Sequence, residues 1–164
     1  MNTYLIDYAD SESFDEIIQL WEASVRATHH FLSEEDILFY RSLLLNNYLK
    51  AVDLYKIYNE AKKIVAFLGV NERHIEMLFI HPGERGKGLG KQLIHFSIDK
   101  LHCNAVDVNE QNTQAVGFYL KMGFEVTSRD EKDGCGKPFP ILHMKLSKPT
   151  TYYQSELECP EKPL

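Results

Sequence analysis

The chain has 164 residues, of which 44% are hydrophobic and 26% charged, and its formal net charge at pH 7 is -6. This size and composition predict one globular domain with a substantial core. The negative net charge argues against a nucleic-acid-binding or anionic-membrane-binding surface, because both of these partners need a basic face.

Neither a membrane span nor a signal peptide is predicted. The sequence has no apolar run of the length that crosses a bilayer, and its N-terminus lacks the basic and then apolar pattern of a secretory leader. A cytoplasmic location is therefore expected. The cysteines are widely spaced and have no histidine pairs nearby, which is typical of reduced thiols and predicts no metal site: Cys103, Cys135 and Cys159.

The first 50 residues predict a strand followed by two helices. Residues 3–8 alternate apolar and polar side chains, as a half-buried strand does. Ser13 and Glu16 have the spacing of a capping box, and the helix that they open carries an apolar stripe of Phe14, Ile17, Ile18, Trp21 and Val25. Ser33 begins a second helix, which has acidic residues in its first turn and three side chains spaced for burial: Ile37, Leu44 and Tyr48.

The remaining elements predict an α/β fold. Residues 52–59 and 64–71 are strand-like and are joined by a short polar segment, so they form a hairpin, and residues 74–80 pair beside them. A long amphipathic helix, a strand at 105–109, a helix opened by Asn112 and strands at 124–129 and near 141–146 follow. We expect a mixed, mostly antiparallel sheet of six to seven strands with about four flanking helices. The domain covers residues 1–147, and residues 148–164, which lack periodicity, form a flexible tail.

The strand at 74–80 leads into a glycine-rich loop, Arg85-Gly86-Lys87-Gly88-Leu89-Gly90, which opens the long helix. The first turn of a helix has unpaired N–H groups and a partial positive charge, and glycines let an anion approach the backbone closely. Arg85, Lys87 and Lys91 add formal charge at the same end. This arrangement predicts a phosphate-binding site.

The spacing of the glycines in the loop excludes two classes of phosphate-binding site. A P-loop requires a lysine and then a serine or threonine after its last glycine, but Leu89 follows Gly88 here. A dinucleotide-binding fold requires Gly-x-Gly-x-x-Gly early in a parallel sheet, whereas this loop lies in the middle of the chain after hairpin-connected strands. Neither of these sites is therefore expected.

Two motifs together resemble the GNAT superfamily of N-acetyltransferases. The first is Arg85-x-x-Gly88-x-Gly90 after an apolar strand, and the second is Asn112-x-x-Ala115-x-x-Phe118-Tyr119-x-x-x-Gly123-Phe124. The resemblance covers about residues 3–147. Within the superfamily the chain looks like the small bacterial YjaB-type acetyltransferases at Trp21, Ala27-Thr28-His29, Phe31-Leu32-Ser33, Asn109-Glu110-Gln111-Asn112 and Gly136-Lys137-Pro138.

This resemblance implies a GNAT-like fold and an acyltransferase that uses acetyl-CoA. By position in the motifs, coenzyme A binds to the strand, the glycine loop and the second helix: Leu78, Phe79, Ile80, Arg85, Gly86, Lys87, Gly88, Leu89, Gly90, Asn112, Ala115, Phe118 and Tyr119. The connection between the first two helices borders the acceptor pocket in the family, which makes His29, His30 and Phe31 candidates for substrate binding. A solvated or capping role for the histidines and a core contact for Phe31 remain open.

Acyl transfer to an amine needs a base, because an alkylammonium of pKa near 10.4 is almost fully protonated at pH 7. His74, Glu76 and Leu78 are expected on one face of their strand, and GNAT enzymes commonly place an acidic or histidine base at such positions. Glu76 is the first candidate base and His74 the second. The alternative is that both are solvated residues of a polar face.

The family resemblance assigns protonation of the leaving thiolate to Tyr119. A tyrosine of ordinary pKa is a weaker acid than a thiol, so Tyr119 requires either a pKa lowered by the helix start and nearby lysine, or a proton from the cationic tetrahedral intermediate. Backbone N–H groups near Phe79 and Ile80 meet the oxyanion. Because the sequence offers no Ser-His-Asp or Cys-His arrangement, direct transfer in a ternary complex is expected.

The acceptor is a primary amine of a small molecule, peptide or protein, and the acidic body favours cationic acceptors. Two other functions stay open: a non-catalytic or regulatory acyl-CoA-binding protein, and an interaction domain in which the glycine loop only caps a helix. The protein is expected to be a monomer or homodimer, with no nucleic-acid or membrane partner.

Overall fold

The computed structural model describes residues 3–147, so the predicted tail at 148–164 lies outside the described residues. Seven strands form one sheet: β1 (Ile6–Ala9), β2 (Asp53–Tyr58), β3 (Ile64–Asn71), β4 (His74–Ile80), β5 (Ala105–Asn109), β6 (Phe124–Asp130) and β7 (Ile141–Leu146). Four helices accompany them: α1 (Phe14–Thr28), α2 (Glu34–Asn46), α3 (Leu89–Asp99) and α4 (Thr113–Lys121).

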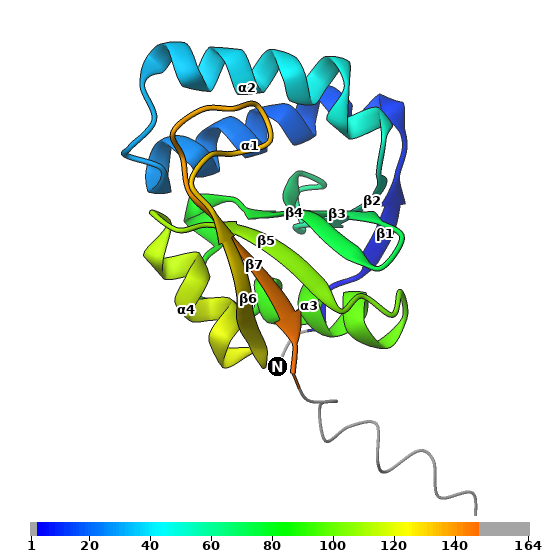
Figure 1. The fold of residues 1–164 in the computed structure, drawn as a ribbon. Helices are drawn as coiled ribbons and strands as arrows, with labels where there is room; N and C mark the ends of the chain where they lie inside the picture. Colours follow the sequence, from blue (N-terminus) through cyan, green and yellow to red (C-terminus); the bar gives the residue numbers. More distant parts are fainter. Residues whose placement is uncertain (1–2, 148–164) are drawn as a thin grey trace, which may run out of the picture.

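The sheet has the strand order β1-β2-β3-β4-β5-β7-β6, and only the β4–β5 pair is parallel. Helices α1 and α2 lie on one side of the sheet, and α3 and α4 lie on the other (Figure 1). This arrangement confirms the predicted fold class of a mixed, mostly antiparallel sheet with four flanking helices.

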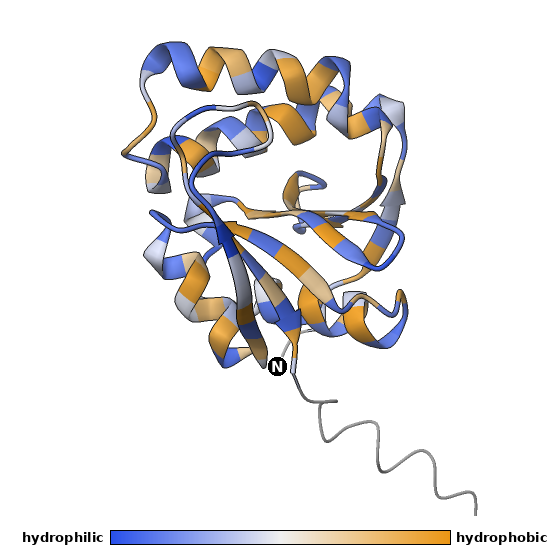
Figure 2. Ribbon diagram, in the orientation of Figure 1, coloured by the Kyte–Doolittle hydropathy of each residue, from blue (hydrophilic) through white to orange (hydrophobic). Residues whose placement is uncertain are grey.

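The core consists of two hydrophobic clusters separated by the sheet. One contains Leu93 of α3 and Phe124 of β6, and the other contains Trp21 of α1 and Phe67 of β3. Residues 64–70 of β3 are all buried, because helices cover both faces of this strand. Hydrophobic residues recur between hydrophilic ones along α1 and α2, as expected for helices with one buried face (Figure 2).

Strands β4 and β5 separate soon after they meet. Their parallel pairing includes only His74 with Ala105 and Ile75 with Val106. Beyond that point β4 pairs only with β3, on its other side. The backbone of β4 on the β5 side therefore has unpaired groups that a ligand can meet.

A bulge in β4 changes which side chains share a face. Met77 pairs with Gly69 and Ile75 pairs with Val70, so Glu76 is an extra residue with no partner in the ladder. As a consequence Leu78 packs against the same cluster as Ile75, although they are three positions apart. The predicted single face for His74, Glu76 and Leu78 is therefore wrong, because the bulge interrupts the alternation.

The helix that begins at Phe14 is present, but Ser13 and Glu16 do not form a capping box. The Ser13 side chain makes no capping bond, and its hydroxyl accepts a hydrogen bond from Lys56 Nζ at 2.8 Å. Glu16 instead accepts the backbone N–H of Ile64 at 2.7 Å, which ties α1 to the sheet. Both side chains bond to residues of the sheet instead of capping the helix.

The second helix has the capping box that the first lacks. The Ser33 hydroxyl accepts the Asp36 N–H, and the Asp36 carboxylate accepts the Ser33 N–H, each at 3.1 Å. The prediction that Tyr48 is buried is wrong: it is 43% exposed. Helix α2 ends at Asn46, and the short turn that follows places Leu49 in the core instead.

Loss of this cap should destabilise the protein. Ser33→Ala removes the hydroxyl that accepts the Asp36 N–H and is expected to lower the free energy of unfolding by about 1 kcal/mol. Urea unfolding followed by circular dichroism measures the change. Ser42→Ala, on the exposed side of the same helix, is the control and should cost no stability, because alanine favours helix. Equal losses in both variants would contradict the role of the cap.

The loop between β6 and β7 is packed against α2. Lys137 Nζ lies 2.6 Å from Asp36 Oδ1 and 4.4 Å from the centre of the Phe39 ring. The Tyr40 hydroxyl donates a hydrogen bond to Asp133, and the Phe139 ring contacts Tyr40. The loop is thereby held over the α1–α2 side of the sheet.

Within residues 3–147, no helix has the length and hydropathy needed to cross a membrane.

Candidate active site

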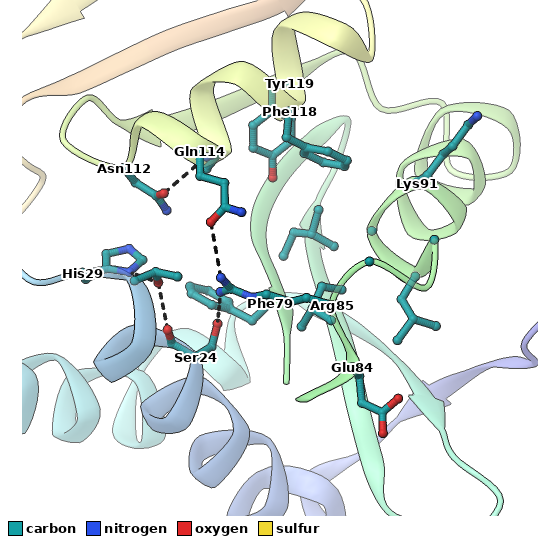
Figure 3. A pocket seen from close by; sticks show the side chains of 18 residues that line it. Ser24, His29, Phe79, Glu84, Arg85, Lys91, Asn112, Gln114, Phe118 and Tyr119 are labelled. Carbon is teal, nitrogen blue, oxygen red and sulfur yellow. Dashed lines mark hydrogen bonds between the residues drawn. The ribbon is translucent and has the colours of Figure 1, made fainter. Parts of the chain in front are cut away.

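A cleft of about 390 Å³ opens where β4 and β5 separate. We call it the cofactor cleft. Its walls come from α1, the end of β4, the glycine loop, the start of α3, and α4 (Figure 3). The walls include all but one of the predicted coenzyme A-binding residues: Leu78, Phe79, Ile80, Arg85, Gly86, Gly88, Leu89, Gly90, Asn112, Ala115, Phe118 and Tyr119.

The glycine loop presents the first turn of α3 to the cleft. Gly88 is the N-cap residue and has a φ of 83°, in the left-handed region that favours glycine. A Cβ atom at Gly90 would lie 3.3 Å from the Phe118 ring, so this position leaves little room for a side chain. The N–H groups of the first turn have no acceptor within the helix and are available to an anion.

Arg85 spans the cleft between two helices. Its guanidinium donates hydrogen bonds to Gln114 Oε1 at 3.3 Å and to Ser24 Oγ at 3.5 Å (Figure 3). Lys87, the predicted residue that the cleft walls do not include, is exposed and pairs with Glu84 at 2.7 Å. The positive side chain that reaches across the cleft is therefore that of Arg85, in addition to the helix end, whereas the Lys91 side chain points away (Figure 3).

Tyr119 is fixed at the inner end of the cofactor cleft. The residue is 6% exposed, and its ring packs edge-on against Phe118 and Phe124. The Asn112 side chain accepts the Ala115 N–H at 3.2 Å and so fixes the start of α4. Burial raises the pKa of the Tyr119 hydroxyl, which disfavours the first of the two alternatives, a lowered pKa, and leaves the proton of the cationic intermediate. The phenol is protonated at neutral pH.

The three candidate substrate-binding residues separate in the structure. His29 lines the cofactor cleft, and its Nδ1 lies 2.8 Å from Thr28 Oγ1. Burial, with the nearby charge of Arg85, lowers the pKa of His29 to about 4, so the ring is neutral at pH 7 and is a weak base. His30 is exposed, and Phe31 packs between His29 and Phe139. Neither His30 nor Phe31 lines the cleft.

Two further spaces extend from the cleft towards the α1–α2 side of the sheet. The connecting cavity, of about 140 Å³, lies in the gap between β4 and β5 and shares His29, Phe79 and Tyr119 with the cofactor cleft. The acidic cavity, of about 600 Å³, lies beyond it under the β6–β7 loop, and four carboxylates line it: Glu76, Asp107, Asp130 and Asp133. Glu76 and Asp107 border both spaces.

The two candidate bases occupy different places. The Glu76 side chain is 39% exposed and reaches the connecting and acidic cavities. His74 is absent from the walls of all three spaces, and its Nδ1 is buried behind Glu76 Oε1 at 3.2 Å.

Several residues that line the cofactor cleft and the acidic cavity were not predicted from the sequence. Asp107 and His143 come from β5 and β7, and Ser24 and Gln114 contact Arg85 across the cleft. The alternation of β5 predicts that Asp107 points away from its buried neighbours Val106 and Val108, but no local signal indicates that its neighbour in space is His74.

Comparisons with known proteins agree with this architecture. Residues 22–148 match the family model described as an acetyltransferase (GNAT) domain. The chain is 40% identical over 136 residues to the peptidyl-lysine N-acetyltransferase YjaB of Salmonella typhimurium, a match that covers 81% of this chain and 91% of the relative.

Solved structures have the same fold. The solution structure of apo YjaB from Escherichia coli superposes with a TM-score of 0.82 at 36% identity, covering 90% of this chain and 100% of that one. The PaiA N-acetyltransferase of Thermoplasma acidophilum, solved with coenzyme A, has a TM-score of 0.66 at 20% identity and covers 88% and 99% of the two chains. With its family model, its 40% identical relative and its cofactor cleft, the chain belongs to the GNAT family and is an acetyl-CoA-dependent N-acetyltransferase.

Proposed function

We propose that this enzyme transfers the acetyl group of acetyl-CoA directly to the side-chain amine of a lysine in a peptide or protein. One observation carries the proposal: the cofactor cleft continues through the connecting cavity into the acidic cavity, so a thioester and a cationic amine can meet between Tyr119 and Glu76. The name of the relative, a peptidyl-lysine N-acetyltransferase, supports the choice of acceptor.

In this proposal the pyrophosphate of acetyl-CoA lies on the first turn of α3, where the N–H groups and Arg85 neutralise its charge. The pantetheine arm lies along the free edge of β4 and pairs with the backbone groups of residues 78–80. Of the N–H groups near Phe79 and Ile80, one that is not paired with the pantetheine arm would stabilise the oxyanion of the tetrahedral intermediate.

Glu76 is proposed as the group that takes the proton of the acceptor ammonium. It is the candidate base whose carboxylate reaches the cavities, whereas neither ring nitrogen of His74 does. The acidic cavity has four carboxylates against two basic side chains, Lys132 and His143, so its excess of negative charge favours a cationic acceptor.

Direct transfer in a ternary complex is proposed because neither described cysteine is placed to form an acyl-enzyme. Burial raises the pKa of the Cys103 thiol to about 11, and Cys135 lies in the exposed β6–β7 loop, 3.7 Å from the Tyr48 hydroxyl. The walls of the cofactor cleft include neither residue.

Tyr119→Phe should lower kcat by about 10-fold and leave the affinity for acetyl-CoA unchanged, because it removes one hydroxyl beside the leaving sulfur and keeps the ring packing. The raised pKa of the hydroxyl supports a proton that originates in the cationic intermediate and passes to the thiolate through Tyr119. Steady-state kinetics and calorimetric titration measure the two quantities. Wild-type turnover in this variant would exclude the donor role.

The proposed function is tested with a peptide that has one lysine and a blocked N-terminus. Release of free CoA is followed with a thiol reagent, and mass spectrometry locates the acetyl group. The matched control is the same peptide with norleucine in place of lysine, and spermidine represents small-molecule amines. Acetylation of the lysine peptide alone supports the proposal, turnover with spermidine alone would move the acceptor to small polyamines, and acetyl-CoA binding without turnover of any amine would favour a non-catalytic role.

A further inference from the structure

We propose that Asp107 of β5 is a positioning residue for acetyl transfer. Asp107 orients the His74 ring so that His74 Nδ1 faces Glu76. Glu76 takes the proton of the acceptor ammonium and passes it to His74 Nδ1. This inference rests on the proposed function and adds to it a group that stores the proton. Four strands contribute to the arrangement: His74 lies on β4, Asp107 on β5 is held by His143 of β7, and His143 is in turn paired with Asp130 of β6.

The His74 ring lies between two carboxylates. Its Nδ1 is 3.2 Å from Glu76 Oε1, and its Nε2 is 3.4 Å from Asp107 Oδ1. The Nδ1 atom is shielded from solvent and has no hydrogen-bond partner in this structure. A buried ring nitrogen costs stability when it is unpaired, and a proton shared with Glu76 would satisfy it.

Asp107 is held by a second imidazole. His143 Nδ1 lies 2.7 Å from Asp107 Oδ1, the same oxygen that faces His74, and His143 Nε2 lies 2.7 Å from Asp130 Oδ2. A histidine that donates to two carboxylates is an imidazolium, and Asp130 and then Asp107 raise the pKa of His143 accordingly. Burial opposes the charged form of Asp107, but its hydrogen bonds from the two histidines hold its pKa below the usual range.

Glu76 and His74 together provide a stronger base than a carboxylate alone. An ordinary glutamate is a weaker base than an ordinary imidazole by about two pKa units, a factor of about 10² in the equilibrium for holding the proton. The N–H bond of the acceptor ammonium breaks as an O–H bond forms on Glu76, and this proton then forms an N–H bond at His74 Nδ1. Glu76 is left as a carboxylate beside an imidazolium that also donates to Asp107, and the amine lone pair attacks the thioester.

Asp107 selects the tautomer that this step needs. A carboxylate accepts the Nε2–H of a neutral His74 ring and leaves the Nδ1 lone pair facing Glu76. The pKa of His74 is raised, chiefly by Asp107, against the effect of burial and with a contribution from Glu76. The other titratable groups around the acidic cavity are Tyr48, Asp130, Lys132, Asp133 and His143.

The sign of the pH effect follows from this geometry. When His74 is already protonated it has no free nitrogen for the acceptor's proton, so kcat/KM rises with pH through the pKa of His74. Asp107→Asn removes the charge that raises this pKa, and its amide can donate to Nε2 and favour the wrong tautomer. The acid limb of the profile should therefore move to lower pH, and kcat at pH 8 should fall by about 10- to 100-fold.

The experiment compares Asp107→Asn with Glu110→Gln in the full chain, using acetyl-CoA and the single-lysine peptide. Glu110 forms an exposed ion pair with Arg129 at 2.8 Å just beyond the same strand, so its variant matches the loss of a paired carboxylate. KM for acetyl-CoA should stay within about twofold in both variants, because neither residue lines the cofactor cleft. A uniform loss of activity at all pH values, without movement of the acid limb, would overturn the proposal.

Two further measurements test the role of Asp107 independently of whether the enzyme acetylates lysine. An NMR titration of the His74 ring protons should give a lower pKa in Asp107→Asn than in wild type, and this readout needs no turnover. An unchanged pKa would reject the role of Asp107 even if the enzyme acetylates lysine. His143→Gln, which keeps the Asp107 charge but removes the imidazolium beside it, should raise the pKa of His74, the opposite direction, and serves if Asp107→Asn does not fold.

Discussion

Glu76→Gln should lower kcat at pH 7.5 by about 10²- to 10⁴-fold, the range that a positioned general base contributes. The amide has the size of the carboxylate but cannot take a proton from the acceptor ammonium. The affinity for acetyl-CoA should not change, because Glu76 lies outside the cofactor cleft. Initial rates with the single-lysine peptide and calorimetry with acetyl-CoA measure the two effects.

The pH dependence of this loss distinguishes a base from a residue that only binds the substrate. Above about pH 10.4 more than half of an ordinary lysine amine is already neutral, so the deficit of Glu76→Gln should shrink as the pH rises. Glu125→Gln, which neutralises an exposed carboxylate on β6, is the control and should behave as wild type. A constant deficit across the pH range, with a raised KM for the peptide, would instead assign Glu76 to acceptor binding.

Gly88→Asp should weaken acetyl-CoA binding by at least about 100-fold, equivalent to about 3 kcal/mol. Three effects act in the same direction. The φ of 83° is unfavourable for a residue with a Cβ, the new carboxylate repels the pyrophosphate, and an aspartate at an N-cap bonds to the N–H groups that the phosphate needs. Calorimetric titration of acetyl-CoA measures the change.

Gly136→Asp is the matched control for this variant. Gly136 has a φ of 76°, and a Cβ atom there would meet nothing within 4 Å, so the substitution carries the same charge and similar backbone strain. It lies in the β6–β7 loop, away from the walls of the cofactor cleft. Wild-type affinity in Gly136→Asp with lost affinity in Gly88→Asp would confirm the phosphate site. Equal loss in both would attribute the effect to general destabilisation, and retained affinity in Gly88→Asp would place the pyrophosphate elsewhere.

Motifs whose function depends on a short stretch of backbone were predictable from sequence. The turn at Gly88, the first turn of α3 and the Asn112 cap of α4 each depend on residues within a few positions of one another. All but one of the residues predicted to bind coenzyme A therefore line the cofactor cleft, and Lys87 is the exception, because it pairs with Glu84 three positions before it.

Contacts between residues distant in sequence explain most of the differences between the predicted and the observed structure. Glu16 bonds to the backbone of β3 instead of capping its own helix, which no spacing rule anticipates. The β6–β7 loop has the composition of a mobile segment, yet Lys137 pairs with Asp36, 101 positions away in sequence. The energy of such contacts depends on which surfaces the fold brings together, and that information is distributed over the whole chain.

The sequence by itself determined the fold class, because periodicity and caps are local properties of one element, and its two motifs determined the family and the cofactor by their resemblance to GNAT proteins. Only the tertiary structure decided how the acceptor side is built. The bulge at Glu76 sends its carboxylate towards the cavities and Leu78 towards the opposite cluster, and the packing of β4, β5 and β7 brings His74, Asp107 and His143 together. Pairing between strands that are distant in sequence sets these neighbours, so no local pattern contains them.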